Sequence, residues 1–438
     1  MPFPCVGLML ALLVASSMTA QQPPALDALL QPEAASLDAL YKHLHANPEL
    51  SFHEKETAAR LSAELTAAGF TVTTGVGGHG IVGVMTNGPG KTVLVRTDLD
   101  GLPVTENTGA PYASKVRTKD DQGNEVGVMH ACGHDIHMAA FIGTARLLAK
   151  LKTQWKGTVV MIGQPAEERG GGASAMLKDG LFSRFPRPDY CLALHTDAAL
   201  QTGRIGFREG FAMANVDSVD VTIRGVGGHG AYPNATKDPV LIAAQFIQAI
   251  QTIVSREVRP IDSAVITVGS IHGGSKRNVI PDQVELQLTV RSYSDQVREQ
   301  MLTAIRRIAV GVARTAGVPP DREPIVNASA EDFTPALYND PALVQRLLPV
   351  WRRQLGEQNV VARDPEMGGE DFSLYGRVDP KIPVFQFRVG TIDAERMNAA
   401  ATAPLPSLHS ALYRPVPHPT IETGIKAMTA AVLELLAK

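Results

Sequence analysis

One ten-residue segment, MHACGHDIHM at positions 129–138, concentrates metal-binding side chains. It holds one thiol, three imidazoles and one carboxylate: Cys132, His130, His134, His137 and Asp135. Borderline transition metals prefer imidazole and thiolate, and a bound cation would keep the thiol deprotonated. The alternative is that the segment only begins a helix, since a carboxylate favours a helix N-terminus and the following MAAFIGTARLLAKL has helical periodicity. We interpret the segment as metal-binding and expect further ligands elsewhere.

Candidate ligands follow three apolar runs. The strand-like GTVVMIG at 157–163 leads into Glu167 and Glu168, and the run CLALHTD brings His195 to the end of a second strand. His409 lies in a proline-rich loop near the C-terminus. Open α/β sheets place their sites at the carboxyl ends of strands, although a lone histidine is more often a core or surface residue. Together with segment 129–138 these residues form a mixed Cys/His/Glu set that suits two adjacent divalent ions.

Asp98 and Asp100 follow another buried strand, in KTVLVRTDLDGLP. If the strand continues, alternation sends both carboxylates to the same side. The alternative is an Asx-type turn before the glycine and proline that follow. Beside a metal cluster, a carboxylate that orients a ligating histidine is a common requirement, and Asp100 is our candidate for that role.

The order of expected elements indicates an α/β protein of two domains, one inserted in the other. Alternating strands and helices predict a three-layer α/β domain built from residues 21–214 and 327–438. Residues 215–326 have the order β-α-β-β-α-β, which predicts a ferredoxin-like α+β domain.

The composition describes a folded, soluble protein and excludes some functions. The chain has 438 residues, of which 44% are hydrophobic and 19% charged, with a formal net charge of −3. The sequence has no basic patch interleaved with aromatic residues, so it does not indicate nucleic-acid binding. The glycines of GGHG and GGS lack the Lys-Ser/Thr of a phosphate-binding loop.

Residues 1–20 resemble a secretory signal peptide, so we expect a secreted or periplasmic protein. The run VGLMLALLVA is too short to span a membrane and is followed by small residues, although no Lys or Arg precedes it. Removal of the segment, which contains Cys5, would leave Cys132 and Cys191. Two cysteines are no disulfide framework, and Cys191 reads as a buried hydrophobe. A reversible disulfide between these two residues stays open.

Several motifs in order make the chain resemble a known family. They are RTDLDGLP, HACGHDIHMAA, GQPAEERGGG, ALH, GGHGA, NVIPD, GxEDF and LH. The chain is similar to the di-metal amidohydrolases of the aminoacylase and carboxypeptidase clan. The branch with hippurate hydrolase, N-acyl-amino-acid amidohydrolases and hydrolases of indole-acetyl-amino-acid conjugates is the most similar.

The resemblance implies two divalent metal ions and a role for each motif residue. The implied metal ligands are Cys132, His134, Glu168, His195 and His409. Glu167 is the implied general base. The chemistry agrees, since a divalent ion lowers the pKa of bound water to about 7 and a free carboxylate beside a ligand can move the water proton.

The resemblance also implies that the inserted domain covers the site and mediates pairing into a homodimer. His229 would then steady the oxyanion and Asn278 would meet the substrate, although His229 by itself reads as a solvated loop residue. Arg291 could hold a substrate carboxylate, with an exposed strand arginine as the alternative. Glu370 and Asp371 match a loop near the pocket.

Two segments depart from the family's pattern. They are Thr196-Asp197 after the strand histidine and Ser410-Ala411-Leu412 after His409. Neither removes an implied ligand, but both leave the acyl-side specificity open.

We therefore expect a secreted, divalent-metal-dependent amidohydrolase that cleaves N-acyl-amino acids. A carboxypeptidase or dipeptidase acting on short peptides is the second hypothesis, and an exported metal-binding protein without activity is the third. Glu167 separates the last from the others, because a binding protein needs no free base beside its ligands. Ligands of this kind accept Zn, Mn, Co or Ni, so the sequence does not identify the metal.

Overall fold

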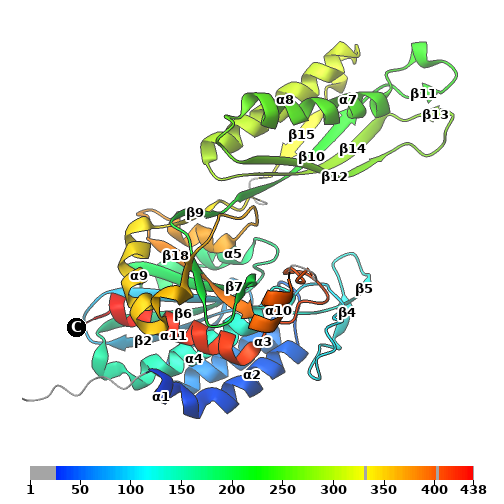
Figure 1. Ribbon diagram of the computed structural model, residues 1–438. Helices are drawn as coiled ribbons and strands as arrows, with labels where there is room; N and C mark the ends of the chain where they lie inside the picture. The colour runs from blue at the N-terminus through cyan, green and yellow to red at the C-terminus, as the bar shows by residue number, and fades with distance from the viewer. Residues whose placement is uncertain (1–25, 330–332, 401–403, 438) are drawn as a thin grey trace, which may run out of the picture.

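The computed structural model describes residues 26–329, 333–400 and 404–437. The expected signal peptide, residues 1–20, lies outside the described residues. A larger α/β body and a smaller α+β body are joined by extended segments (Figure 1). No helix in the described ranges combines the length and apolarity that crossing a bilayer would need.

An eight-stranded sheet forms the centre of the larger body, in the order β1-β2-β6-β3-β7-β18-β8-β17. Its four central strands are parallel: β6 (Gly157–Gln164), β3 (Thr92–Asp98), β7 (Tyr190–Gln201) and β18 (Val384–Ile392). The outer strands are β1 (Thr71–Val76), β2 (Gly80–Asn87), β8 (Ile205–Phe207) and β17 (Val360–Ala362). The parallel strands all end at one edge of the sheet.

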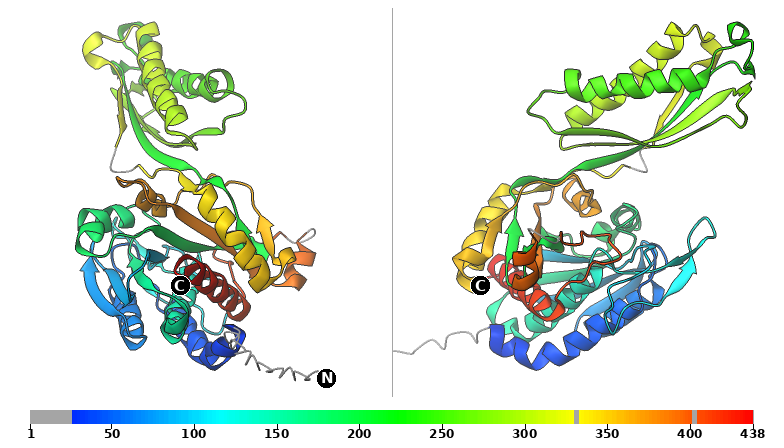
Figure 2. Two further views of the ribbon diagram at one scale, coloured as in Figure 1. Left: turned by 90° about the vertical axis from the view of Figure 1, so that its left-hand side faces the viewer. Right: turned by 45° about the vertical axis from the view of Figure 1, so that its right-hand side comes forward.

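Helices cover both faces of this sheet (Figure 2), which confirms the predicted three-layer α/β architecture. One face packs on α1 (Leu26–Leu30), α2 (Ala34–Ala46), α3 (Lys55–Ala67), α4 (His134–Lys150), α9 (Pro341–Leu355) and α11 (Pro417–Leu435). The other packs on α5 (Gly172–Lys178), α6 (Leu181–Arg184) and the 3-10 helix η7 (Asp371–Gly376). Because both faces are buried, β3 reads as a continuous apolar run rather than an alternating one.

The smaller body is an antiparallel sheet under two helices, with its own apolar core. Its strand order is β12-β14-β10-β15. In chain order its elements are β10 (Asn215–Arg224), α7 (Pro239–Thr252), β12 (Ala264–Gly273), β14 (Gln283–Ser292), α8 (Asp295–Thr315) and β15 (Ile325–Ala328). This is the predicted ferredoxin-like arrangement. The last strand runs to Ala328, past the predicted domain boundary at 326, because it pairs with β10.

Short elements complete the chain. They are β4 (Arg117–Lys119), β5 (Glu125–Gly127), β9 (Gly210–Met213), β11 (Gly228–His229), β13 (Val279–Ile280), β16 (Leu337–Asn339) and α10 (Ala394–Ala399). The pair β11 and β13 lies at the end of the smaller body that is remote from the larger one (Figure 1).

Close packing of α4 on α11 supports the helix that begins at the site. A Cβ added at Gly143 of α4 would lie 2.2 Å from Cδ1 of the buried Ile425. At Gly311 of α8 an added Cβ would meet nothing within 4 Å. We expect Gly143→Ala to lower the free energy of unfolding by about 1–3 kcal/mol through overpacking. The matched Gly311→Ala should raise it by up to about 1 kcal/mol through helix propensity. Denaturant titrations of both variants check this, and equal effects would contradict it.

Candidate metal centre

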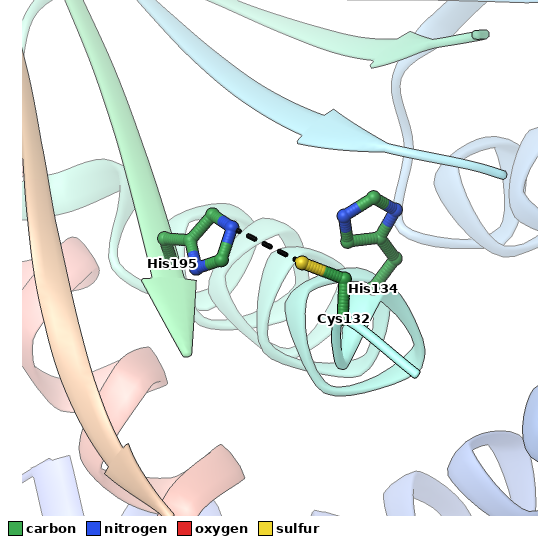
Figure 3. A group of neighbouring side chains, drawn as sticks. All are labelled: Cys132, His134 and His195. Atoms are coloured by element: carbon green, nitrogen blue, oxygen red, sulfur yellow. Dashed lines mark hydrogen bonds between the residues drawn. The ribbon is translucent and has the colours of Figure 1, made fainter. Parts of the chain in front are cut away.

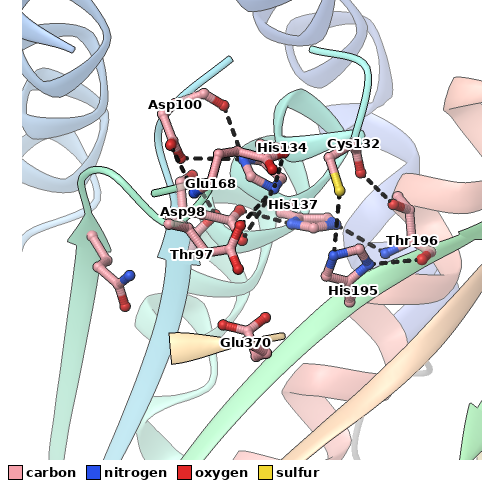
Figure 4. A network of polar contacts seen from close by, with 12 residues as sticks. Thr97, Asp98, Asp100, Cys132, His134, His137, Glu168, His195, Thr196 and Glu370 are labelled. Carbon is pink, nitrogen blue, oxygen red and sulfur yellow. Dashed lines mark hydrogen bonds and ion pairs between the residues drawn. The ribbon is translucent and has the colours of Figure 1, made fainter. Parts of the chain in front are cut away.

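The candidate metal centre lies where the parallel strands of the large sheet end (Figure 4). Asp98 ends β3, His195 lies on β7, and Glu168 follows β6. Cys132 and His134 come from the turn that leads into α4. These residues are far apart in the sequence and meet because parallel strands present their carboxyl ends to the same edge.

All five expected metal ligands belong to two groups that share Cys132. The first is Cys132, His134 and His195, and Figure 3 shows the three side chains facing one another. The second is Cys132, Glu168 and His409. In each group the ligand atoms lie within 4.8 Å of one another, and Cys132 Sγ is 3.5 Å from His195 Nε2. Two overlapping groups are the arrangement that two neighbouring ions require.

Gly133 makes the turn between the two CGH ligands possible. Its φ is 81°, a left-handed conformation that favours glycine, and an added Cβ would lie 2.8 Å from Thr196 Cγ2. Thr196 Oγ1 in turn donates to the carbonyl of Cys132 at 2.6 Å. Helix α4 begins directly afterwards, with Asp135 in its first turn. The segment therefore both begins a helix and presents metal ligands.

Hydrogen bonds orient the two buried histidine ligands. His134 Nδ1 donates to the carbonyl of Asp100 at 2.9 Å, and His195 Nδ1 donates to the carbonyl of Thr196 at 2.8 Å. Each bond leaves the Nε2 lone pair for a metal ion. His134 Nε2 and Glu168 Oε1 are buried and have no hydrogen-bond partner among the described residues. Buried polar atoms without partners are rare, and these two fit a bound divalent ion.

The environment of Cys132 favours the neutral thiol until a cation is present. Burial, and then the Glu168 carboxylate, raise the pKa of the Cys132 thiol well above its usual value. A bound divalent ion would reverse this and release the thiol proton. Cys191 is buried in the sheet core, where burial raises its pKa, and both cysteines are free.

Of the two glutamates after β6, Glu167 is buried and Glu168 is partly buried. Burial, and then the neighbouring Glu370 carboxylate, raise the pKa of Glu167 well above its ordinary value. Burial raises the pKa of Glu168 to about 7. Strongly shifted pKa values of buried carboxyl groups are typical of functional sites.

His409 reaches the centre from the C-terminal loop. Its backbone φ is 67°, and its N–H donates to the carbonyl of Ala131 at 2.9 Å. Its Nε2 lies 3.5 Å from Glu168 Oε2, while 55% of the side chain is exposed. Of the five expected ligands it is the most open to the pocket.

Asp98 and Asp100 support the ligands through different hydrogen bonds. Asp100 Oδ2 accepts from Ser51 Oγ at 2.7 Å and from the N–H of Glu168 at 3.0 Å, and its Oδ1 lies 3.4 Å from His134 Nδ1. The role of Asp98 was not predicted from the sequence: its Oδ1 accepts from His137 Nδ1 at 2.7 Å.

His137 is engaged at both ring nitrogens. In addition to its bond to Asp98, its Nε2 accepts the N–H of Thr196 at 2.9 Å. Asp98, His134 and His137 have the proximity of a metal site, but we assign His137 to hydrogen bonding. It links β3 to β7 behind the ligands.

Arg96 is a second residue that the sequence analysis missed. Its side chain is completely buried and donates to Asp98 at 2.7 Å, Glu370 at 3.0 Å and Asp371 at 3.3 Å. Its Nε also donates to Gln164 at 3.0 Å. An arginine inside the apolar run VLVRTD was the available signal, because a charge in a buried strand needs partners. The GxEDF loop is thus held beside Glu167, whose carboxylate lies within 4.8 Å of those of Glu370 and Asp371.

A pocket of about 560 Å³ opens over the centre. Its lining includes Glu167, His195 and His409, together with Arg291 of β14 and Arg388 of β18. Arg291 Nη1 donates to the carbonyl of Met367 at 2.6 Å, so the smaller body contacts the larger one at the rim.

His229 and Asn278 do not line this pocket. His229 lies on β11 and Asn278 directly precedes β13, and Gly230 donates to the carbonyl of Asn278 at 2.9 Å. Both residues are exposed. The pair β11 and β13 lies at the remote end of the smaller body (Figure 1). The structure brings these two residues to each other but not, within one chain, to the metal centre.

Comparisons with known proteins agree with this geometry. Residues 94–409 match the model of peptidase family M20/M25/M40. Thermostable carboxypeptidase 2 of Saccharolobus solfataricus is 36% identical, with 80% of this chain and 84% of the relative covered. N-acetylcysteine deacetylase of Bacillus subtilis is 36% identical over 82% and 89% of the two chains. IAA-amino acid hydrolase ILR1-like 4 of Arabidopsis thaliana is 35% identical over 85% and 79%.

A solved structure extends the likeness to the metal centre. The YXEP protein of Bacillus subtilis, described as a dinuclear metal-binding peptidase of the M20 family, superposes with a TM-score of 0.75 at 28% identity. The superposition covers 93% of this chain and 99% of that one. The chain therefore belongs to peptidase family M20/M25/M40 and is a metal-dependent amidohydrolase with two divalent ions.

Proposed function

We propose that this enzyme hydrolyses the amide bond of N-acyl-amino acids, with Glu167 as its general base. The observation that carries the proposal is the position of Glu167. It is buried and adjacent to Glu168, and it also lies in two further groups of potential ligands, one with His134 and one with Glu370. The two groups that share Cys132 nevertheless contain all five expected ligands without it. A carboxyl group in that position is free to accept a proton from water.

The roles of the remaining residues follow from their contacts. Cys132, His134, Glu168, His195 and His409 would hold the two ions. When bound, the ions supply an activated water and polarise the amide carbonyl. Glu167 would take the proton from the attacking water and return it to the leaving nitrogen, a role worth about 10²- to 10⁴-fold in rate. Asp100 keeps His134 and the Glu168 backbone in place.

Arg291 is the proposed partner of the substrate carboxylate. It reaches the pocket from the inserted body, where its guanidinium is partly buried. An arginine fork binds a carboxylate through two parallel hydrogen bonds, which would fix the position of the amide.

The names of the relatives support this substrate class. Two of them are named for N-acetylcysteine deacetylation and IAA-amino acid hydrolysis, and a third is named as a carboxypeptidase. Carboxypeptidase or dipeptidase activity on short peptides is therefore the second candidate, since the same centre would act on a peptide bond.

His229 and Asn278 could act only after a rearrangement or through a second chain. We propose that the inserted body brings His229 over a metal centre, of its own chain or of a partner in a homodimer, to steady the oxyanion. His229 is exposed, and because its Nδ1 accepts the N–H of Ala231 at 3.0 Å, the contact would be made through Nε2.

Export is proposed from residues 1–20 alone. Their apolar run and the small residues after it suit cleavage by a signal peptidase and a secreted or periplasmic enzyme.

Exchanges of the two adjacent glutamates should have different effects. Glu167→Gln should keep both ions and lose about 10²- to 10⁴-fold in kcat, because only the proton carrier is removed. Glu168→Gln should lose metal. Elemental analysis and amine release from a panel of N-acyl-amino acids and dipeptides measure both. Near-normal turnover by Glu167→Gln would show that Glu167 is not the general base. A preference for dipeptides over N-acyl-amino acids would favour the carboxypeptidase or dipeptidase activity.

The metal should protect Cys132 from alkylation. We expect iodoacetamide to modify Cys132 only after a chelator has removed the ions, and metal affinity to fall with acid, because protons compete for the thiolate. Cys191 is an internal control that should react only on unfolding, since it is fully buried. Mass spectrometry of the two peptides measures this. Equal labelling of Cys132 with and without metal would show that it is not a ligand.

His229 should matter for turnover and not for metal binding. We expect His229→Ala to lower kcat about 10²- to 10³-fold, the usual effect of losing one oxyanion donor, with unchanged metal content. Mixing this variant with Glu167→Gln distinguishes the two routes. Activity should return if His229 serves a partner's centre and should stay low if it serves its own. A kcat within about twofold of wild type would assign His229 to the solvated loop.

A further inference from the structure

The segment Ser51–Glu54 lies against the turn that carries the two catalytic-site glutamates. It connects α2 to α3 and is far from Glu167 and Glu168 in the sequence. The proposed mechanism gives it no task. Two direct contacts and a third through Asp100 nevertheless join it to residues 166–171.

Glu54 accepts two backbone hydrogen bonds with a single oxygen. The N–H of Phe52 and the N–H of Ala166 both donate to its Oε1, at 2.9 Å and 2.7 Å. Glu54 is completely buried, and within the described part of the chain its Oε2 has no hydrogen-bond partner. The position of this side chain is therefore set by the two donors.

Both donors have left-handed backbone conformations. Phe52 has a φ of 66° and Ala166 a φ of 49°, and His409 is the only other described non-glycine residue with a positive φ. Such a conformation costs free energy for a residue with a Cβ and persists only where its surroundings hold it. One carboxylate oxygen thus supports two strained positions.

Ala166 lies at the centre of the hydrogen bonds that form the turn after β6. It is fully buried, its carbonyl accepts from Gly171 and Gly172 at 3.2 Å each, and Gly170 donates to the carbonyl of Glu167 at 2.7 Å. The glutamate pair follows Ala166 directly. The direction in which both side chains leave the turn therefore depends on the conformation of this residue.

The same segment also supports the turn beyond the glutamates. Ser51 Oγ donates to Asp100 Oδ2 at 2.7 Å, and that oxygen accepts the N–H of Glu168 at 3.0 Å. A Cβ added at Gly171 would lie 3.0 Å from Cζ of Phe52, so the phenyl ring packs directly on the turn. The turn is held before and after the glutamate pair.

We propose that Glu54 is a positioning residue that holds Ala166 in its left-handed conformation and thereby directs Glu167 and Glu168 into the metal pocket. The proposal rests on the roles proposed above for these two glutamates. It assigns the function to the acceptor oxygen of Glu54 and to its two backbone donors, with no contact to the substrate.

Two exchanges of Glu54 separate the acceptor from the charge. Glu54→Ala removes the acceptor, and we expect metal affinity and kcat to fall about 10- to 100-fold, as for other residues that orient metal ligands, with little change in KM. Glu54→Gln keeps an acceptor oxygen and should stay within about threefold of wild type in both quantities. Glu56→Ala, at an exposed position of α3, is the control and should change neither by more than about twofold.

A second exchange tests whether Ala166 is the point of action. Glycine adopts the left-handed conformation without a Cβ penalty, so Ala166→Gly should make Glu54 less important. The loss caused by Glu54→Ala should therefore be several-fold smaller in the Ala166→Gly background. A merely structural role of Glu54 would give the same loss in both backgrounds.

For each variant we would measure metal affinity by competition with a chelating dye, together with kcat, KM and the thermal unfolding temperature. A loss in Glu54→Gln equal to that in Glu54→Ala, or no rescue by Ala166→Gly, would overturn the proposal. If Glu54→Ala does not fold, the double variant replaces it: recovery of folding and metal binding supports the proposal, and continued failure overturns it. If the wild type hydrolyses no member of the panel, the proposed substrate class is wrong, while the metal affinities still test Glu54.

Discussion

The candidate site depends on the ion pairs that the buried guanidinium of Arg96 forms. Three carboxylates, those of Asp98, Glu370 and Asp371, meet around it without access to solvent. Uncompensated charges of one sign at this density would be forced to neutralise, and breaking a buried ion pair typically costs about 3–5 kcal/mol. Arg96 compensates the carboxylates at the base of the site, and the metal ions would compensate those at its mouth. The Glu370 carboxylate, held by Arg96, is also a cause of the raised pKa of Glu167.

A continuous set of hydrogen bonds leads from Arg96 to the ligands, and Figure 4 shows its part from Asp98 to Cys132. Asp98 joins Arg96 to His137, His137 accepts the N–H of Thr196, and Thr196 donates to the carbonyl of Cys132. This connection passes from β3 through α4 to β7, so it fixes three elements relative to one another. The side-chain hydroxyl of Thr196 thereby supports the turn around Gly133.

The two bodies contribute unequally to the site. All five expected ligands and Glu167 belong to the larger body, whereas the smaller one supplies Arg291 at the pocket rim. His229 and Asn278 lie together on the remote pair β11 and β13. Metal binding can therefore be complete within the larger body, while contacts to the substrate depend on how the smaller body is placed.

The sequence alone predicted the three-layer sheet and the β-α-β-β-α-β insertion, because apolar periodicity is a local property that defines the strands. The five ligand positions came from the family resemblance: Cys132 and His134 share one short motif, whereas the other three ligands lie in separate segments. Only the tertiary structure decided that His137 links strands, that Arg96 compensates three carboxylates, and that Glu54 reaches Ala166. Each of these depends on partners far apart in the sequence, such as Arg96 and Glu370, whose contact is a consequence of strand order and not of spacing. The placement of His229 away from the pocket has the same origin, since the geometry of the whole inserted body determines it.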